Sequence, residues 1–208
     1  MPDLPERRDR ESRMTANVSS ILAPFVTTAP SGALSVDRLA ADVESVSRGE
    51  LRDTFVAAAL LLFWTLELQF DRYALDTAAT QWATQRAAAL GGEVASNSRS
   101  AMAAGWDGAE LFSRDRAARL AATETTRAIS AGEGWARGVA ETASGVPLLA
   151  TWHTEDDASV CPVCSRLNDR DEAFWGDQFP SGPPAHPNCR CWLSYTPLGS
   201  RQLAGANA

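Results

Sequence analysis

The feature that most constrains this chain is a set of five sulfur and nitrogen ligands gathered near its C-terminal end. Cys161-Pro-Val-Cys164 is followed, after a loop, by His186-Pro-Asn-Cys189-Arg-Cys191. Two ligand groups joined by a loop are the pattern of a tetrahedral Zn²⁺ site, because a two-residue spacer lets both thiolates turn toward one ion. We therefore expect a structural zinc site. Its candidate ligands are Cys161, Cys164, His186, Cys189 and Cys191, with Cys189 preferred to Cys191 for the fourth position.

The sequence around these ligands explains why a metal would be needed. Residues 155–190 are rich in Pro, Gly and Asp and have little apolar periodicity. A loop of this length is uncommon inside a compact domain unless something other than a core holds it. A bound ion would supply the missing folding free energy.

Three other interpretations of the cysteines stay open. They could form two disulfides, but the chain opens without an apolar signal segment, so we expect it to fold in the cytosol, where disulfides are rare. They could be buried free thiols, although their dense spacing favours ligation. A catalytic metal would need an open coordination position and a general base.

Upstream of this stretch the sequence predicts helices. Residues 1–34 contain four prolines and no long apolar run, so we expect a flexible N-terminal arm with at most a short docked segment at 21–26. Residues 35–144 are expected to form a helical body. Its predicted helices cover 36–48, ending near Gly49; 51–90, as one long helix or two in line, ending at Gly91-Gly92; 93–104; 109–131, ending at Gly132 and Gly134; and 135–142.

Residues 145–198 differ from the helical body in their sequence pattern. Strands are expected at 146–154 and 192–196, and Trp152 and Trp192 would face each other if these strands pair. Residues 199–208 are expected to be a loose tail. The predicted fold class is therefore α+β, mostly α: a helical body with one long helix, followed by a small zinc-stapled β-hairpin knuckle.

Charge and hydrophobicity argue against two kinds of interaction, which are nucleic-acid binding through bulk charge and insertion into a membrane. The 208 residues carry a net charge of −7, and all 19 basic residues are arginine. A chain this acidic does not bind nucleic acid through bulk charge. The longest uncharged apolar run, 54–66, falls well short of the roughly 20 residues that span a bilayer, so we expect no membrane partner.

The motifs of two metal-dependent enzyme classes do not fit this sequence. His153-Thr154-Glu155 before a Cys-x-x-Cys is similar to the zinc deaminase signature. The gap from Glu155 to Cys161 is too short for the strand and helix that separate those motifs. An HNH-type nuclease would need additional catalytic histidines, and the chain has two in all. We therefore expect no enzyme activity and no small-molecule substrate. A zinc-dependent DNA-binding or DNA-processing protein remains the alternative.

Three motifs occur together and in order in the C-terminal half. They are Thr123-Glu124-Thr125-Thr126-Arg127-Ala128; Trp152-x-Thr154-x-x-Asp157-x-x-x-Cys161-Pro162-x-Cys164-x-x-Leu167; and Pro183-Pro184-x-His186-Pro187-Asn188-Cys189-Arg190-Cys191. In this combination the chain resembles the phage Mu F-like minor head protein family, also called the phage head morphogenesis domain, over about residues 95–195.

The resemblance implies a minor capsid protein of a tailed phage, a prophage or a phage-derived particle. Expected partners are the portal protein, a scaffold or major capsid protein, and the packaged DNA. The expected location is the virion, in the capsid interior or near the portal, and the host cytoplasm during assembly. The implied role is binding that aids head assembly or DNA packaging and delivery. No catalytic residue is implied.

Overall fold

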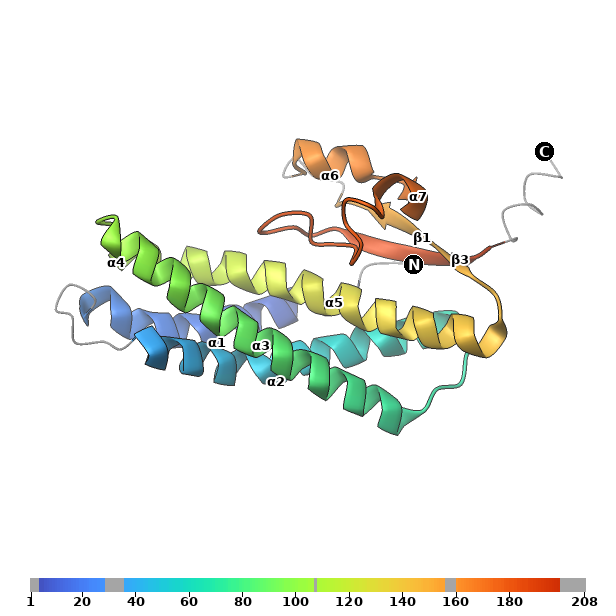
Figure 1. Ribbon diagram of the computed structural model, residues 1–208, viewed down its shortest axis with the longest axis horizontal. Helices are drawn as coiled ribbons and strands as arrows, with labels where there is room; N and C mark the ends of the chain where they lie inside the picture. Colours follow the sequence, from blue (N-terminus) through green and yellow to red (C-terminus); the bar gives the residue numbers. More distant parts are fainter. Residues whose placement is uncertain (1–3, 29–35, 107, 156–159, 199–208) are drawn as a thin grey trace.

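The computed structural model describes residues 4–28, 36–106, 108–155 and 160–198 (Figure 1). Four helices longer than 20 residues lie side by side, and a small antiparallel sheet with two short helices lies along one of them, α5. The predicted class, α+β and mostly α, is confirmed. The helices are α1 (Arg7–Thr28), α2 (Val36–Thr65), α3 (Arg72–Ala103), α4 (Gly108–Leu111), α5 (Arg114–Ser144), α6 (Pro162–Leu167) and α7 (Glu172–Trp175). The strands are β1 (Leu148–His153), β2 (Arg170–Asp171) and β3 (Trp192–Pro197).

Helix α1 corrects the expectation of a flexible arm over residues 1–34. Met14, Val18, Leu22 and Phe25 are buried, and they pack against α2, α3 and α5 in one hydrophobic cluster. Their spacing of three to four residues places them on one face of a helix whose other faces are polar. The arm is therefore wrong for 7–28, while 1–3, 29–35 and the predicted tail, 199–208, lie outside the described residues.

The segment predicted as one long helix, or two in line, is instead split between two helices that fold back on each other. Helix α2 ends at Thr65 and α3 begins at Arg72. Asp71 forms the N-cap of α3, because its carboxylate accepts the backbone N–H of Tyr73 at 2.8 Å. No Gly or Pro marks this turn, so the breaker signals in the sequence missed it.

Several glycines lie inside helices instead of ending them. Gly49 lies inside α2, Gly91 and Gly92 inside α3, and Gly132 and Gly134 inside α5. Two of these glycines are needed for close helix packing. A Cβ at Gly91 would lie 2.4 Å from the carbonyl oxygen of Ala40, and a Cβ at Gly132 would lie 2.2 Å from that of Phe55. These glycines allow α2 to approach α3 and α5 closely.

The sheet has the order β2-β1-β3, and both pairings are antiparallel. Strands β1 and β3 correspond to the two predicted strands. Trp152 pairs with Leu193 and His153 pairs with Trp192, so the predicted facing of Trp152 and Trp192 is wrong by one residue. This difference puts the two tryptophans on opposite faces of the sheet.

The aromatic side chains of the knuckle belong to a hydrophobic core that it shares with α2, α3 and α5. Trp152 is fully buried and packs against Trp175 and Phe179, with ring centroids 5.5 and 5.6 Å apart. Leu167 and Leu193 belong to the same cluster. Apolar packing therefore holds the sheet and α7, while the loop before β3 contributes mainly polar and sulfur groups. Within the described ranges, no helix is long and apolar enough to cross a bilayer.

Candidate metal centre

The first two candidate ligands are placed by the start of α6. Cys161 is the N-cap of this helix and Pro162 is its first residue, a position where the missing N–H of proline costs nothing. The Sγ atom of Cys161 accepts the backbone N–H of Cys164 at 3.3 Å. The Cys-Pro-x-Cys order thus builds a tight turn in which both sulfurs lie on one side.

Hydrogen bonding at this turn favours the thiolate form of Cys161. Burial by itself would raise the pKa of this thiol, but the backbone N–H groups of Cys164 and Val163 and the nearby His186 bring the pKa below its ordinary value. A thiolate is the form that binds a metal.

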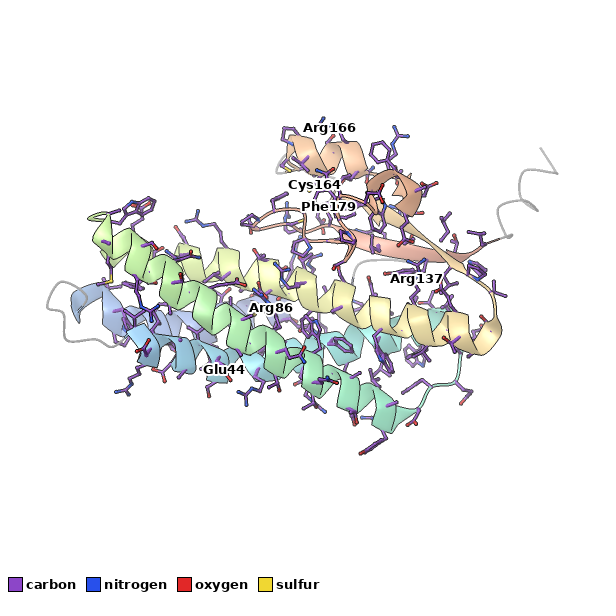
Figure 2. All side chains as sticks on the ribbon, in the orientation of Figure 1. Glu44, Arg86, Arg137, Cys164, Arg166 and Phe179 are labelled. Carbon is purple, nitrogen blue, oxygen red and sulfur yellow. The ribbon has the colours of Figure 1, made fainter. Side chains whose placement is uncertain are left out.

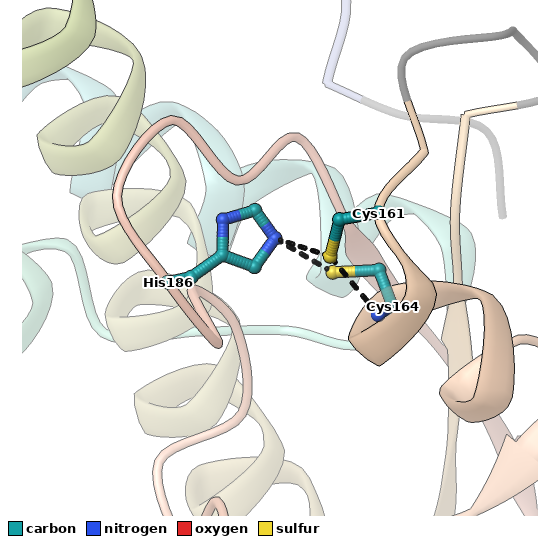
Figure 3. Close-up of side chains that lie close together, drawn as sticks. All are labelled: Cys161, Cys164 and His186. Atoms are coloured by element: carbon teal, nitrogen blue, oxygen red, sulfur yellow. Dashed lines mark hydrogen bonds between the residues drawn. The ribbon is translucent and has the colours of Figure 1, made fainter.

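His186 reaches the same point from the loop before β3 (Figure 3). Its Nδ1 lies 2.7 Å from the carbonyl oxygen of Pro187, which can only accept, so Nδ1 carries the proton. When the ring is neutral, its Nε2 directs its lone pair at the sulfurs of Cys161 and Cys164, at 3.1 and 3.0 Å. Holding the outer ring nitrogen on a carbonyl is the usual way to orient a ligating histidine.

The five predicted ligands form two overlapping groups that share Cys164. In one group Cys164 lies with Cys161 and His186, and in the other it lies with Cys189 and Cys191; the ligand atoms within each group are within 4.8 Å of one another. The Sγ atoms of Cys164 and Cys189 are 3.8 Å apart. Zn–S bonds of about 2.3 Å in a tetrahedron give sulfur–sulfur separations of about 3.8 Å. This Cys/His cluster could hold a metal such as zinc.

The sulfurs of Cys164, Cys189 and Cys191 are electrostatically coupled, and all three residues are buried. Hydrogen bonds with Cys164 and Cys191 lower the pKa of Cys189. Hydrogen bonds with Cys189 and Cys191 raise the pKa of Cys164. Several thiolates cannot coexist at this distance without a compensating cation. A divalent ion would remove this repulsion and release the remaining protons.

The loop that carries Cys189 is held by a buried arginine from the other end of the chain. Arg7, at the start of α1, donates from Nη1 to the carbonyl oxygen of Arg190 at 2.9 Å and from Nη2 to that of Cys189 at 3.4 Å. Its Nε also donates to the carboxylate of Glu11. Only 5% of Arg7 is exposed, so it is an internal contact between α1 and the ligand loop.

Helix α5 also contacts this loop, through the Thr-Glu-Thr-Thr motif. The hydroxyl of Thr126 donates to the carbonyl oxygen of Cys189 at 2.5 Å, and Thr123 Oγ1 accepts the backbone N–H of Asn188 at 2.7 Å. These contacts link the first motif quoted above to the third. The motif is recognisable in the sequence, but no sequence pattern indicated that these threonines or Arg7 would contact the ligand loop.

Glu124, between those threonines, serves the helical body. Its carboxylate accepts Arg86 Nε at 2.6 Å and Arg86 Nη2 at 2.9 Å, which joins α5 to α3. Figure 2 labels Arg86 on α3. Arg127 Nε also lies 3.5 Å from the carboxylate of Glu124. Glu124 is 2% exposed, so this ion pair is largely desolvated and fixes the helix that carries the two threonines.

A second histidine lies on the outer face of the sheet, away from the ligands. His153 Nε2 is 2.8 Å from Ser194 Oγ, and its Nδ1 is 3.1 Å from an oxygen of Asp169. The order of groups is that of a hydrolase triad, but the Asp169 side chain is 73% exposed, whereas a triad carboxylate is buried. The ring also stacks on Trp192 at 4.3 Å. We interpret these contacts as a structural link between β1 and β3.

The family model described as Phage Mu protein F like protein matches residues 78–194, from near the start of α3 into β3. No curated protein and no solved structure matches the chain. The matched segment contains the Thr-Glu-Thr-Thr helix and all five candidate ligands.

Proposed function

Because the chain belongs to the phage Mu protein F-like family, we propose that it is a minor head protein that binds the portal or the inner capsid during head assembly. Family membership implies a role in head morphogenesis, and members are generally structural. The finer assignment, with the portal, scaffold or major capsid protein as partner and the virion as location, is part of this proposal. The match over 78–194 is the observation that carries it.

We further propose that the protein carries one structural zinc ion, held by Cys161, Cys164, His186 and Cys189, with Cys191 as the alternative fourth ligand. When bound, the ion would cross-link the start of α6 to the loop before β3. The chain's own residues prepare the site: Pro187 orients the histidine, and Arg7 and Thr126 hold the carbonyl groups of the loop. Four protein ligands leave no position for a substrate, which supports a structural role.

The assembly role can be tested in the phage or prophage that encodes the chain. Particles purified after gene deletion should contain fewer DNA-filled heads, and complementation with the wild-type gene should restore them. Cys161→Ser should fail to restore them, because it removes a ligand. Val163→Ser, between the two cysteines and 39% exposed, is the matched control and should restore them. Normal yield of filled heads after deletion would contradict the proposal.

The alternative function, a zinc-dependent DNA-binding or DNA-processing protein, is less well supported. Residues 151–208 contain four arginines and seven acidic residues, and bound thiolates would offset the charge of the ion. Metal-dependent nicking of plasmid DNA by the purified chain, lost in His186→Ala, would favour the alternative. We expect no nicking.

A further inference from the structure

A cavity of about 540 Å³ opens beside the ligand loop, on the side where α1 begins. It lies between the first turns of α1, the first part of α5 and the loop that contains Asn188. Small side chains on α5, Ala118 and Ala122, leave this space open. The volume falls in the range of pockets that hold small ligands, and the cavity is separate from the cluster of candidate metal ligands.

The walls of this cavity are rich in positive charge. Four arginines line it: Arg7, Arg8, Arg114 and Arg190. They come from three separate elements, so the fold gathers them from positions far apart in the sequence. In a chain with a net charge of −7, this concentration of cations is unusual.

Two of these arginines form no ion pair within the part of the chain that the structure describes. Within the described residues, no carboxylate oxygen lies within 4 Å of the guanidinium group of Arg8 or Arg114, although most arginines of the chain form ion pairs. Both are exposed at the cavity mouth. Next to Arg114 on α5, burial and the charge of Arg119 lower the pKa of Arg116, so three arginines gather near this end of the helix, with Asp115 among them.

Two carboxylates also line the cavity, and they limit what can bind there. Glu11 accepts Arg7 Nε at 2.9 Å, so its charge is compensated inside the wall. Glu155 remains, and it disfavours an anion at its own end of the cavity. Four cations against two carboxylates leave an excess of positive charge, with the unpaired arginines at the mouth.

We propose that this cavity binds a phosphate group, with Arg8 and Arg114 as the groups that contact it and Arg7 and Arg190 as a fixed positive background. Guanidinium groups match the oxygens of phosphate in geometry and remain charged at all relevant pH values. The phosphate could come from free inorganic phosphate or from the backbone of DNA. The inference does not rest on the proposed assembly role or on zinc, because its contacts are arginines outside the ligand set.

Two probes distinguish these sources. Inorganic phosphate is titrated into the purified, metal-replete chain by isothermal titration calorimetry in phosphate-free buffer. A fluorescein-labelled 16-base-pair duplex is titrated by fluorescence anisotropy at several salt concentrations. The test variant is Arg8→Gln/Arg114→Gln. The control is Arg38→Gln/Arg48→Gln, which makes the same change in net charge on α2, where both arginines form ion pairs with neighbouring acids.

For the wild type we expect saturable binding of at least one probe. The test variant should raise the dissociation constant at least about tenfold, because it removes two charged hydrogen-bond donors, whereas the control should change it less than about twofold. Binding of phosphate without DNA assigns the site to the free anion. Binding of DNA, with a salt dependence that falls by about one unit per arginine removed, assigns it to the backbone.

Two results would overturn the proposal. One is the absence of saturable binding of both probes to the wild type. The other is an equal loss of binding in the test and control variants, which would indicate an effect of net charge alone. Circular dichroism and zinc content, measured on each variant, verify that the fold is kept. Failure of the anion site would leave the metal site untouched, because the two tests change different residues.

Discussion

The contact between α5 and α2 at Gly132 gives the sharpest prediction of stability. Gly132 is buried, and a methyl group there would lie 2.2 Å from the carbonyl oxygen of Phe55 and 3.0 Å from its carbonyl carbon. Ordinary contacts of a Cβ atom are 3.4 Å or longer. Because the obstacle is backbone, Gly132→Ala would force the two helices apart by roughly 1 Å.

The magnitude follows from two opposing effects. Forcing extra volume into a packed interior costs about 1–3 kcal/mol, and a clash with backbone belongs at the upper end. Alanine is favoured over glycine within a helix by about 1 kcal/mol. The expected net loss for Gly132→Ala is therefore about 2 kcal/mol, which corresponds to a fall in Tm of about 4–8 °C for a chain of this size.

Gly134→Ala is the matched control, two residues further along the same helix. Gly134 is exposed, and a Cβ there would meet nothing within 4 Å. Only the gain in helix propensity remains, so Tm should rise by about 1–4 °C. Differential scanning calorimetry of both variants with the wild type measures the difference. A Gly132→Ala protein as stable as wild type would refute the close packing of α5 on α2.

Three further predictions concern charged groups. Glu124→Ala should destabilise the chain by about 2 kcal/mol in urea unfolding, because it removes two charged hydrogen bonds to Arg86, which keeps Glu93 as its remaining partner; a loss below about 0.5 kcal/mol would contradict the buried pair. Burial lowers the pKa of His153, so the unfolded chain binds that proton more tightly. Its contribution to stability is complete above about pH 6.5 and is lost as the pH falls through the folded-state pKa. The urea midpoint of His153→Asn should therefore depend less on pH between 7.5 and 5 than that of wild type, and an equal dependence would exclude this source. Arg7→Ala should accelerate hydrogen exchange in the ligand loop, whereas Arg8→Ala should not; equal rates would show that Arg7 does not hold the loop.

The sequence allowed the fold class and the candidate ligands to be predicted, because both depend on local patterns. Cys161-x-x-Cys164 turns toward one point whatever surrounds it, and the change of texture at Gly145 coincides with a left-handed helix C-cap, φ 68°. The family resemblance rested on three motifs that occur in order in the sequence, and the family match over 78–194 confirms it.

Tertiary packing decided what the sequence could not. Helix α1 was missed because Met14 and Val18 are flanked by polar residues and because Pro24 lies inside the helix, where a proline usually indicates a break. Gly91 and Gly132 were interpreted as helix ends, but close helix approach explains them better. The pairing of His153 with Trp192 depends on strand register, which a single residue can change.

The contacts that support the ligand loop were beyond prediction for a related reason. Arg7 lies 183 residues from Arg190 along the chain, and no local pattern relates the two. The threonines of the Thr-Glu-Thr-Thr motif gained a role only when α5 was seen beneath Asn188 and Cys189. Sequence patterns thus indicated the candidate ligands, and the structure showed which residues position them.

The central claim is that one metal ion joins the start of α6 to the loop before β3. The direct measurement is the zinc content of the fully reduced protein by mass spectrometry, combined with hydrogen exchange before and after chelation. The account predicts about one zinc per chain, with faster exchange across 160–191 after chelation and little change within α2, α3 and α5. Reduced, chelator-treated protein that contains no metal and keeps slow exchange across 160–191 would contradict it.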